Sequence, residues 1–140
     1  MRELKLEAKV DNLSRALAFV DETLEELSCP MKIQMQLDVA VEELFVNIAS
    51  YAYAPGTGDA VIRIETEGEP PSVSVTFIDS GVPYDPLAKP DPDITLSAMD
   101  REIGGLGIFM VKKSMDDMRY QRKDGKNILT IRKKLALPAR

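Results

Sequence analysis

Three glycines close to residue 105 have the arrangement of a phosphate-binding turn. Gly104, Gly105 and Gly107 lead into an apolar run of helical length, with Leu106 between them. Glycine has no side chain, so a ligand can approach its backbone closely. A helix that begins at such a turn directs free N–H groups and the positive end of its dipole toward phosphate. A helix cap explains one glycine but not three, so the segment predicts a phosphate cradle.

Arg101 stands just before these glycines and has two interpretations. Its guanidinium could neutralise a terminal phosphate, or it could be a solvated charge that pairs with Asp100 or Glu102. The residues alone favour the solvated charge. Arg101 nevertheless belongs among the candidate phosphate-binding residues because of its place beside the cradle.

A second candidate pair stands four residues apart on a predicted helix. Glu43 and Asn47 therefore share one face of that helix. An asparagine amide oxygen can complete an Mg²⁺ shell that is shared with phosphates. A carboxylate one turn earlier can accept the proton of a nucleophile that attacks a γ-phosphate. The alternative is an ordinary solvated polar face, which the pair taken by itself favours.

The third candidate is an acidic residue at the end of a predicted strand. Asp79 is followed by Ser80 and Gly81. Its carboxylate could accept the amino hydrogens of adenine, while Gly81 would leave room for the ring. An Asp-Ser-Gly turn that simply ends a strand is the alternative, and this segment alone favours it. The order of the three segments, however, suits a single nucleotide pocket.

The hydrophobic pattern predicts the elements that position these residues. Apolar residues alternate in strands and recur every three or four positions in helices. The predicted architecture is α+β, a two-layer α/β sandwich with helices on one face of a mixed, mostly antiparallel sheet. Its expected elements are a strand over 4–10, helices over 13–27 and 31–53, strands over 60–67 and 72–79, a long loop over 80–103, a helix over 106–115 and two strands beside the Asp124-Gly125 turn.

Composition excludes several classes of chemistry. The chain has 140 residues, which suits a single domain over 1–140, and its net charge of −5 argues against direct binding of nucleic acid. Cys29 is the only cysteine and there is no histidine, which excludes internal disulfides, His-based nucleophile systems and zinc sites of the usual His or Cys kind. No run of apolar residues reaches membrane-span length and the start is unlike a signal peptide, so we expect a cytoplasmic protein without membrane partners.

Taken together, the segments resemble the histidine-kinase-like (GHKL) ATPase superfamily, which has the Bergerat nucleotide-binding fold. The resemblance is greatest to the bacterial anti-sigma-factor serine-protein kinases. The helix that carries Glu43 and Asn47 resembles the N box, residues 79–85 resemble the first glycine box, and residues 104–107 resemble the second. The resemblance extends over nearly the whole chain, and the motifs are specific in their combined order and spacing.

The resemblance implies ATP and Mg²⁺ as cofactors and gives each candidate a role. Asn47 would bind Mg²⁺, Glu43 would be the general base, and Asp79 would bind adenine. Gly81 would shape the adenine pocket, while Gly105 and Gly107 would help a lid close over the phosphates.

The resemblance also implies a function and partners. The chain would be a serine/threonine-protein kinase and anti-sigma-type regulator in a bacterial partner-switching pathway. Its substrate would be a serine on a small anti-sigma-factor antagonist, and a sigma factor would be a second partner. Members of this branch often form homodimers. The alternatives are a nucleotide-dependent binding switch that transfers no phosphate and a scaffold that binds no nucleotide; the retained Asn47, Asp79 and glycines argue against the scaffold.

Three positions depart from the family pattern or leave it ambiguous. Pro83 stands where other branches have a second glycine, although the serine-kinase branch commonly tolerates proline there. Tyr51 occupies a position where kinases of this branch often carry histidine. Glu42 precedes Glu43, and the spacing to Asn47 favours Glu43 as the general base.

Overall fold

The computed structural model describes residues 1–88 and 105–136. Its strands and helices follow the predicted order along the chain. They are β1 (Arg2–Glu7), a short 3₁₀ helix (Val10–Asn12), α1 (Leu13–Glu26), α2 (Met31–Asn47), the π-helical turn η2 (Ile48–Ala52), β2 (Asp59–Glu67), β3 (Ser72–Asp79), α3 (Gly105–Ser114), β4 (Asp117–Lys123) and β5 (Lys126–Lys134).

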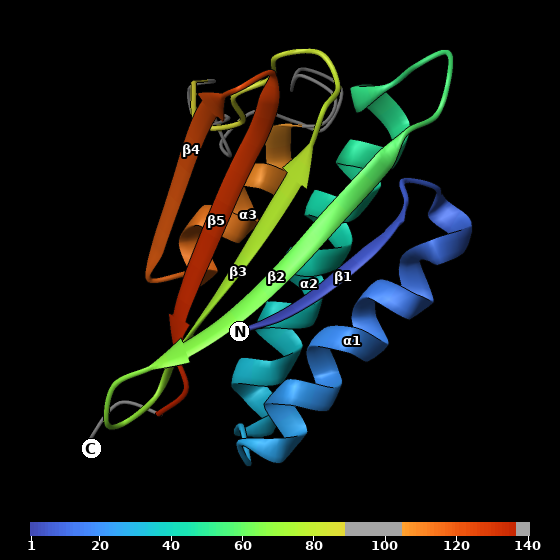
Figure 1. Cartoon of the computed structure of the whole chain (residues 1–140). Helices are drawn as coiled ribbons and strands as arrows, with labels where there is room; N and C mark the ends of the chain where they lie inside the picture. Colours follow the sequence, from blue (N-terminus) through green and yellow to red (C-terminus); the bar gives the residue numbers. More distant parts are fainter. Residues whose placement is uncertain (89–104, 137–140) are drawn as a thin grey trace.

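The five strands form one sheet in the order β1-β2-β3-β5-β4. Each neighbouring pair in the described part of the chain is antiparallel. The three α-helices cover one face of this sheet, so the molecule has two layers (Figure 1). The predicted α+β sandwich is therefore confirmed. The β4–β5 hairpin places β5 rather than β4 beside β3, which brings the beginning of β5 next to the end of β3.

The core lies between the sheet and α2. Alternating residues of β3, Val73, Val75 and Phe77, are buried on the face that the helices cover. Leu37 and Val41 of α2 are also fully buried in the same cluster. Burial of each such side chain contributes about 1.5–3 kcal/mol relative to an exposed position. This packing holds α2 firmly across the strands whose ends carry the candidate residues.

Two elements end earlier than the sequence pattern predicts. β1 ends at Glu7, and Val10 is 55% exposed in the following 3₁₀ helix. α2 ends at Asn47, where a π-helical turn replaces the continuous helix that was predicted to Tyr53. A π turn carries an extra residue in each hydrogen-bonded ring and is frequent at functional sites. Within the described residues, no helix has both the length and the apolar character needed to cross a membrane.

Candidate functional site

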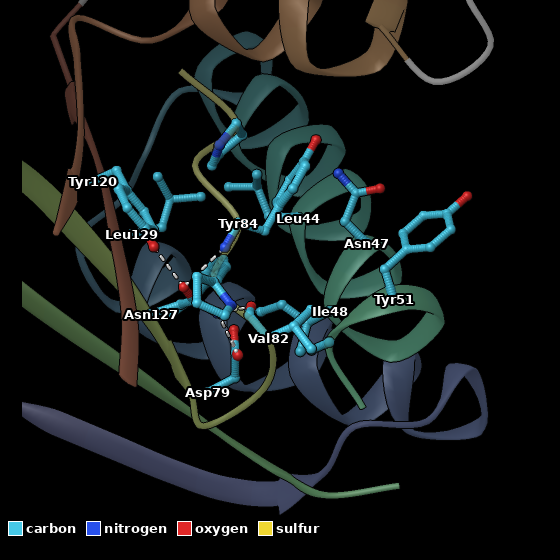
Figure 2. Close-up of a pocket in the computed structure, with 14 residues that line it drawn as sticks. Leu44, Asn47, Ile48, Tyr51, Asp79, Val82, Tyr84, Tyr120, Asn127 and Leu129 are labelled. Atoms are coloured by element: carbon cyan, nitrogen blue, oxygen red, sulfur yellow. Dashed lines mark hydrogen bonds between the residues drawn. The ribbon is translucent and has the colours of Figure 1, made fainter. Parts of the chain in front are cut away.

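A cavity of about 120 Å³ opens between the C-terminal end of α2 and the ends of β3 and β5. The side chains from α2 and η2 form one wall, and those from the sheet and from residues 82–86 form the rest (Figure 2). Most of the lining is apolar or aromatic. The lining residues are Leu44, Asn47, Ile48, Tyr51, Ala52, Phe77, Asp79, Val82, Pro83, Tyr84, Pro86, Tyr120, Asn127 and Leu129.

Asp79 provides the carboxylate of this cavity. It is the last residue of β3 and is only 6% exposed. Its Oδ1 accepts hydrogen bonds from the backbone N–H of Gly81 and from Asn127 Nδ2, each at 2.9 Å. Its Oδ2 accepts no hydrogen bond from the residues that the structure describes, so this oxygen is available to a ligand donor.

Gly81 allows the turn after β3 to pack against η2. A β-carbon at this position would overlap the backbone carbonyl of Ala52. The neighbouring Val82 N–H donates to that same carbonyl oxygen at 2.9 Å. Gly81 itself does not line the cavity. Its absence of a side chain therefore shapes the pocket indirectly, by bringing the turn close to the end of the π-helical segment.

Asn47 and Glu43 lie one turn apart at the C-terminal end of α2. Asn47 is half-buried and lines the cavity on the helix side. Glu43 is half-buried beyond the lining, and its carboxylate lies against the backbone of Gly107 on α3. Glu42 is exposed. Of the two adjacent carboxylates, Glu43 is thus the one that faces the glycine-rich start of α3.

The remaining predicted residues fall at or beyond the edge of the described chain. Arg101 and Gly104 lie outside the described residues. Gly105 begins α3 and Leu106 follows it in the first turn, which agrees with the predicted helix start. The structure thus brings Glu43 to Gly107, and Asp79 to the same cavity as Asn47.

Asn127, Tyr120 and Tyr84 belong to the cavity but escaped the sequence analysis. Asn127 is 6% exposed on β5, directly opposite Asp79 in the strand register. The sequence feature that could have identified Asn127 is its position in the strand alternation. Asn127 lies two residues before the apolar Leu129, so a polar side chain occupies a strand position that faces inward. Two departures from the family pattern, Tyr51 and Pro83, also line the cavity.

The oxygen atoms of the site suit a metal ion that is shared with a bound ligand, rather than one that protein side chains enclose. In residues 1–88 and 105–136, no group of three or more His, Cys, Asp or Glu side chains could hold a metal ion. Asn47 offers one hard oxygen, and Mg²⁺ characteristically combines one or two such protein ligands with water and substrate phosphates. The residues present therefore fit a magnesium ion that arrives with a phosphorylated ligand.

Comparison with known proteins identifies the family. The model of the histidine kinase-like ATPase domain matches residues 6–133. The chain belongs to this family. The predicted resemblance to the histidine-kinase-like superfamily is thereby confirmed, and the cavity lies within the matched ATPase domain.

Two curated relatives of this histidine kinase-like ATPase domain are regulatory proteins. Serine/threonine-protein kinase BtrW from Bordetella bronchiseptica is 32% identical over 100 residues, which cover 71% of this chain and 70% of BtrW. An anti-sigma F factor from Clostridium acetobutylicum is 26% identical over 132 residues, covering 94% of this chain and 91% of the relative. These are the two kinds of protein that the sequence motifs indicated.

A solved structure shares the fold. The RsbU and RsbW domains of Rv1364c from Mycobacterium tuberculosis align with a TM-score of 0.67 at 18% identity. The alignment covers 100% of this chain and 34% of that chain. At this identity the similarity concerns the arrangement of strands and helices.

Proposed function

We propose that this domain binds ATP with Mg²⁺ and transfers the γ-phosphoryl group to a serine of a partner protein. One structural observation carries the proposal. Asp79 has a carboxylate oxygen that accepts no hydrogen bond within residues 1–88 and 105–136, in a mostly apolar cavity that Asn47 also lines, and Glu43 stands one helical turn beyond Asn47. The residues proposed for base recognition, metal binding and proton acceptance thus lie in that order, from Asp79 through Asn47 to Glu43.

The cavity suits a flat ring with an amino group. Ile48, Val82 and Leu129 supply apolar surface around the Asp79 carboxylate. Pockets that enclose a whole drug-sized ligand measure roughly 300–1,000 Å³. The volume of about 120 Å³ therefore fits a ring system rather than a complete nucleotide. The ring is adenine in this proposal, with its amino group donating to Asp79 Oδ2.

The phosphates extend from this ring along α2 toward α3. Asn47 would hold Mg²⁺ through its amide oxygen, and the bound ion would neutralise phosphate charge. Gly105 and Gly107 offer backbone N–H groups at the helix start. Glu43 would accept the serine proton as the hydroxyl attacks. Phosphoryl transfer asks little more of the protein than positioning and charge neutralisation.

The names of the relatives support the choice of partners. BtrW is named a serine/threonine-protein kinase and the clostridial relative an anti-sigma F factor. We infer a cytoplasmic partner-switching pathway, in which the substrate is an antagonist protein and the second partner a sigma factor. A phosphoserine carries about −2 charge, and the net charge of this chain is −5. Phosphorylation would therefore weaken docking of the antagonist by repulsion.

Calorimetric titration of ATP into the purified chain, with and without Mg²⁺, tests the proposal. We expect binding that strengthens with Mg²⁺, and transfer of label from γ-labelled ATP to a serine-bearing antagonist protein. Absence of binding to any adenine nucleotide would contradict the proposal as a whole. Binding without transfer to any acceptor, water included, would instead favour the nucleotide-dependent binding switch.

A further inference from the structure

Asn127 holds more hydrogen bonds than any other side chain of the cavity in the described residues. Its Nδ2 donates to Asp79 Oδ1 at 2.9 Å and to the backbone oxygen of Val82 at 2.8 Å. Its Oδ1 accepts from the Tyr120 hydroxyl at 2.6 Å and from the Tyr84 N–H at 3.3 Å. Both hydrogens and both acceptor positions of the amide are therefore in use. Figure 2 shows Asn127 at the centre of these contacts.

The backbone partners decide which way this amide points. The Tyr84 N–H can only donate and the Val82 oxygen can only accept, so a reversed amide would face a donor with a donor and an acceptor with an acceptor. The Tyr120 hydroxyl reinforces the same orientation by donating to Oδ1. Nδ2 is consequently directed at Asp79.

This orientation determines what Asp79 can offer to a ligand. Asp79 Oδ1 is engaged by two N–H donors, from Gly81 and Asn127. A carboxylate accepts hydrogen bonds and donates none. Oδ2 is then the acceptor that Asp79 has left for a ligand in the cavity that it lines. A ring that carries an amino group at that point gains a hydrogen bond, whereas a ring that carries a carbonyl there meets two acceptors facing each other.

We propose that Asn127, oriented by the backbone of Val82 and Tyr84 and held by the Tyr120 hydroxyl, is a positioning residue that makes the cavity select amino-bearing rings, such as adenine, over carbonyl-bearing rings, such as guanine. Asn127 acts through Asp79 and does not touch the ring. The inference rests on the proposed nucleotide function, because it concerns the base that the same cavity accepts.

The Asn127→Asp variant tests the inference through base selectivity. The variant keeps the shape of the side chain but replaces the Nδ2 donor with an oxygen that faces the Asp79 carboxylate. We expect the preference for ATP over GTP to fall by roughly tenfold to hundredfold at pH 7.5, because an unmatched buried polar group costs that much.

Tyr120→Phe keeps the ring and removes only the hydroxyl that donates to Asn127 Oδ1 and helps to hold the amide in place. It remains informative if Asn127→Asp does not fold, and it should reduce the ATP preference by about threefold to tenfold. Gln121→Glu is the matched control for Asn127→Asp, because it makes the same amide-to-acid change away from the cavity. Gln121 is exposed on the same strand as Tyr120. The control should retain the full preference.

The outcomes separate this inference from the proposed function. An unmodified protein that binds ATP and GTP equally, or folded variants at positions 120 and 127 that keep the full ATP preference, would overturn the role of Asn127 while nucleotide binding stands. An unmodified protein that binds neither nucleotide would overturn both.

Discussion

The carboxylate of Glu43 lies directly against the backbone of Gly107, so that α2 and the beginning of α3 meet at one acidic side chain. A β-carbon on residue 107 would overlap Glu43 Oε1. The contact joins the helix that carries Asn47 to the glycine-rich segment that we assign to phosphate. It places the candidate general base beside the candidate phosphate cradle. Substitutions at the two residues should therefore affect phosphoryl transfer.

Replacing Glu43 with Gln should abolish most phosphoryl transfer and leave ATP binding in place. Glutamine keeps the shape of the side chain but cannot accept the proton, and general base catalysis typically contributes about 10²–10⁴-fold. Release or transfer of labelled phosphate measures the effect. Glu42→Gln is the matched control, because Glu42 is the adjacent carboxylate and is exposed. Equal loss in both variants would argue against Glu43 as the base.

Gly107→Ala should displace the Glu43 carboxylate without unfolding the domain. The overlapping atoms belong to the end of a flexible side chain, which can move aside. Alanine is the better helix former by about 1 kcal/mol, so the free energy of unfolding should not fall. Misplacing a catalytic group by about 1 Å can cost 10²-fold in rate, and phosphate release should drop accordingly.

Gly56→Ala serves as the control for that variant. A β-carbon on Gly56 would make only an ordinary contact, 3.4 Å from the Tyr53 backbone oxygen. Urea unfolding and phosphate release should both remain near the values of the unmodified protein. Full activity of Gly107→Ala would show that Glu43 does not need its present position.

Gly81→Ala should behave differently from Gly107→Ala. Its β-carbon would meet the backbone of Ala52, which cannot turn away as a side chain can. Overpacking of this kind typically costs about 1–3 kcal/mol. We expect a lower urea midpoint together with weaker ATP binding, because the Val82 N–H to Ala52 hydrogen bond would also be strained. Unchanged stability would show that the turn has room to shift.

Asn47→Ala should remove the effect of Mg²⁺ on ATP affinity while the domain stays folded. Asn47 is half-buried at the end of α2 and does not belong to the apolar core. ATP titrated without Mg²⁺ is the internal reference and should bind the variant about as it binds the unmodified protein. Asp79→Asn, in contrast, should weaken ATP in both conditions. A variant at Asn47 that still responds fully to Mg²⁺ would contradict the metal role.

Asp38 should make the domain less stable as the pH rises toward neutrality. The pKa of Asp38 is raised from 3.8 to about 7, chiefly by burial, with smaller contributions from a hydrogen bond shared with Asp21 and from the charges of Asp21 and Glu25. Its Oδ1 is buried and has no hydrogen-bond partner among the described residues. Because the folded state binds the proton more tightly, the stability due to neutral Asp38 is fully present below about pH 3.8 and is lost as the pH rises to 7.

Asp38→Asn should therefore be more stable than the unmodified protein at pH 8 and should flatten the pH dependence between 4 and 7 (the window of the raised pKa, from 3.8 to about 7). Thermal unfolding across this range measures it. Asp124→Asn is the control, because Asp124 is exposed and has a positive φ of 53° that asparagine tolerates. If the stability of the Asp38→Asn variant changes with pH as steeply as that of the unmodified protein, ionisation of Asp38 does not destabilise the folded state.

The strands that carry the site were predictable because their side chains alternate. The predicted strand over 72–79 coincides with β3, and the predicted strand over 60–67 differs from β2 by one residue. The end of α2 was not predictable in this way. Residues 48–52 have an ordinary apolar pattern, and their π-helical turn accompanies a hydrogen bond from Val82, which is far away in the sequence.

Local periodicity was sufficient to place Glu43 and Asn47 on one face of a helix and Asp79 at the end of a strand, because helix and strand geometry depend on near neighbours. Tertiary structure decided the rest. It placed the carboxylate of Glu43, which the spacing to Asn47 already favoured over Glu42, against Gly107, and it brought Asn127 to Asp79 because β5 pairs with β3. Strand order depends on how the whole chain buries its apolar faces, which neighbouring residues do not encode.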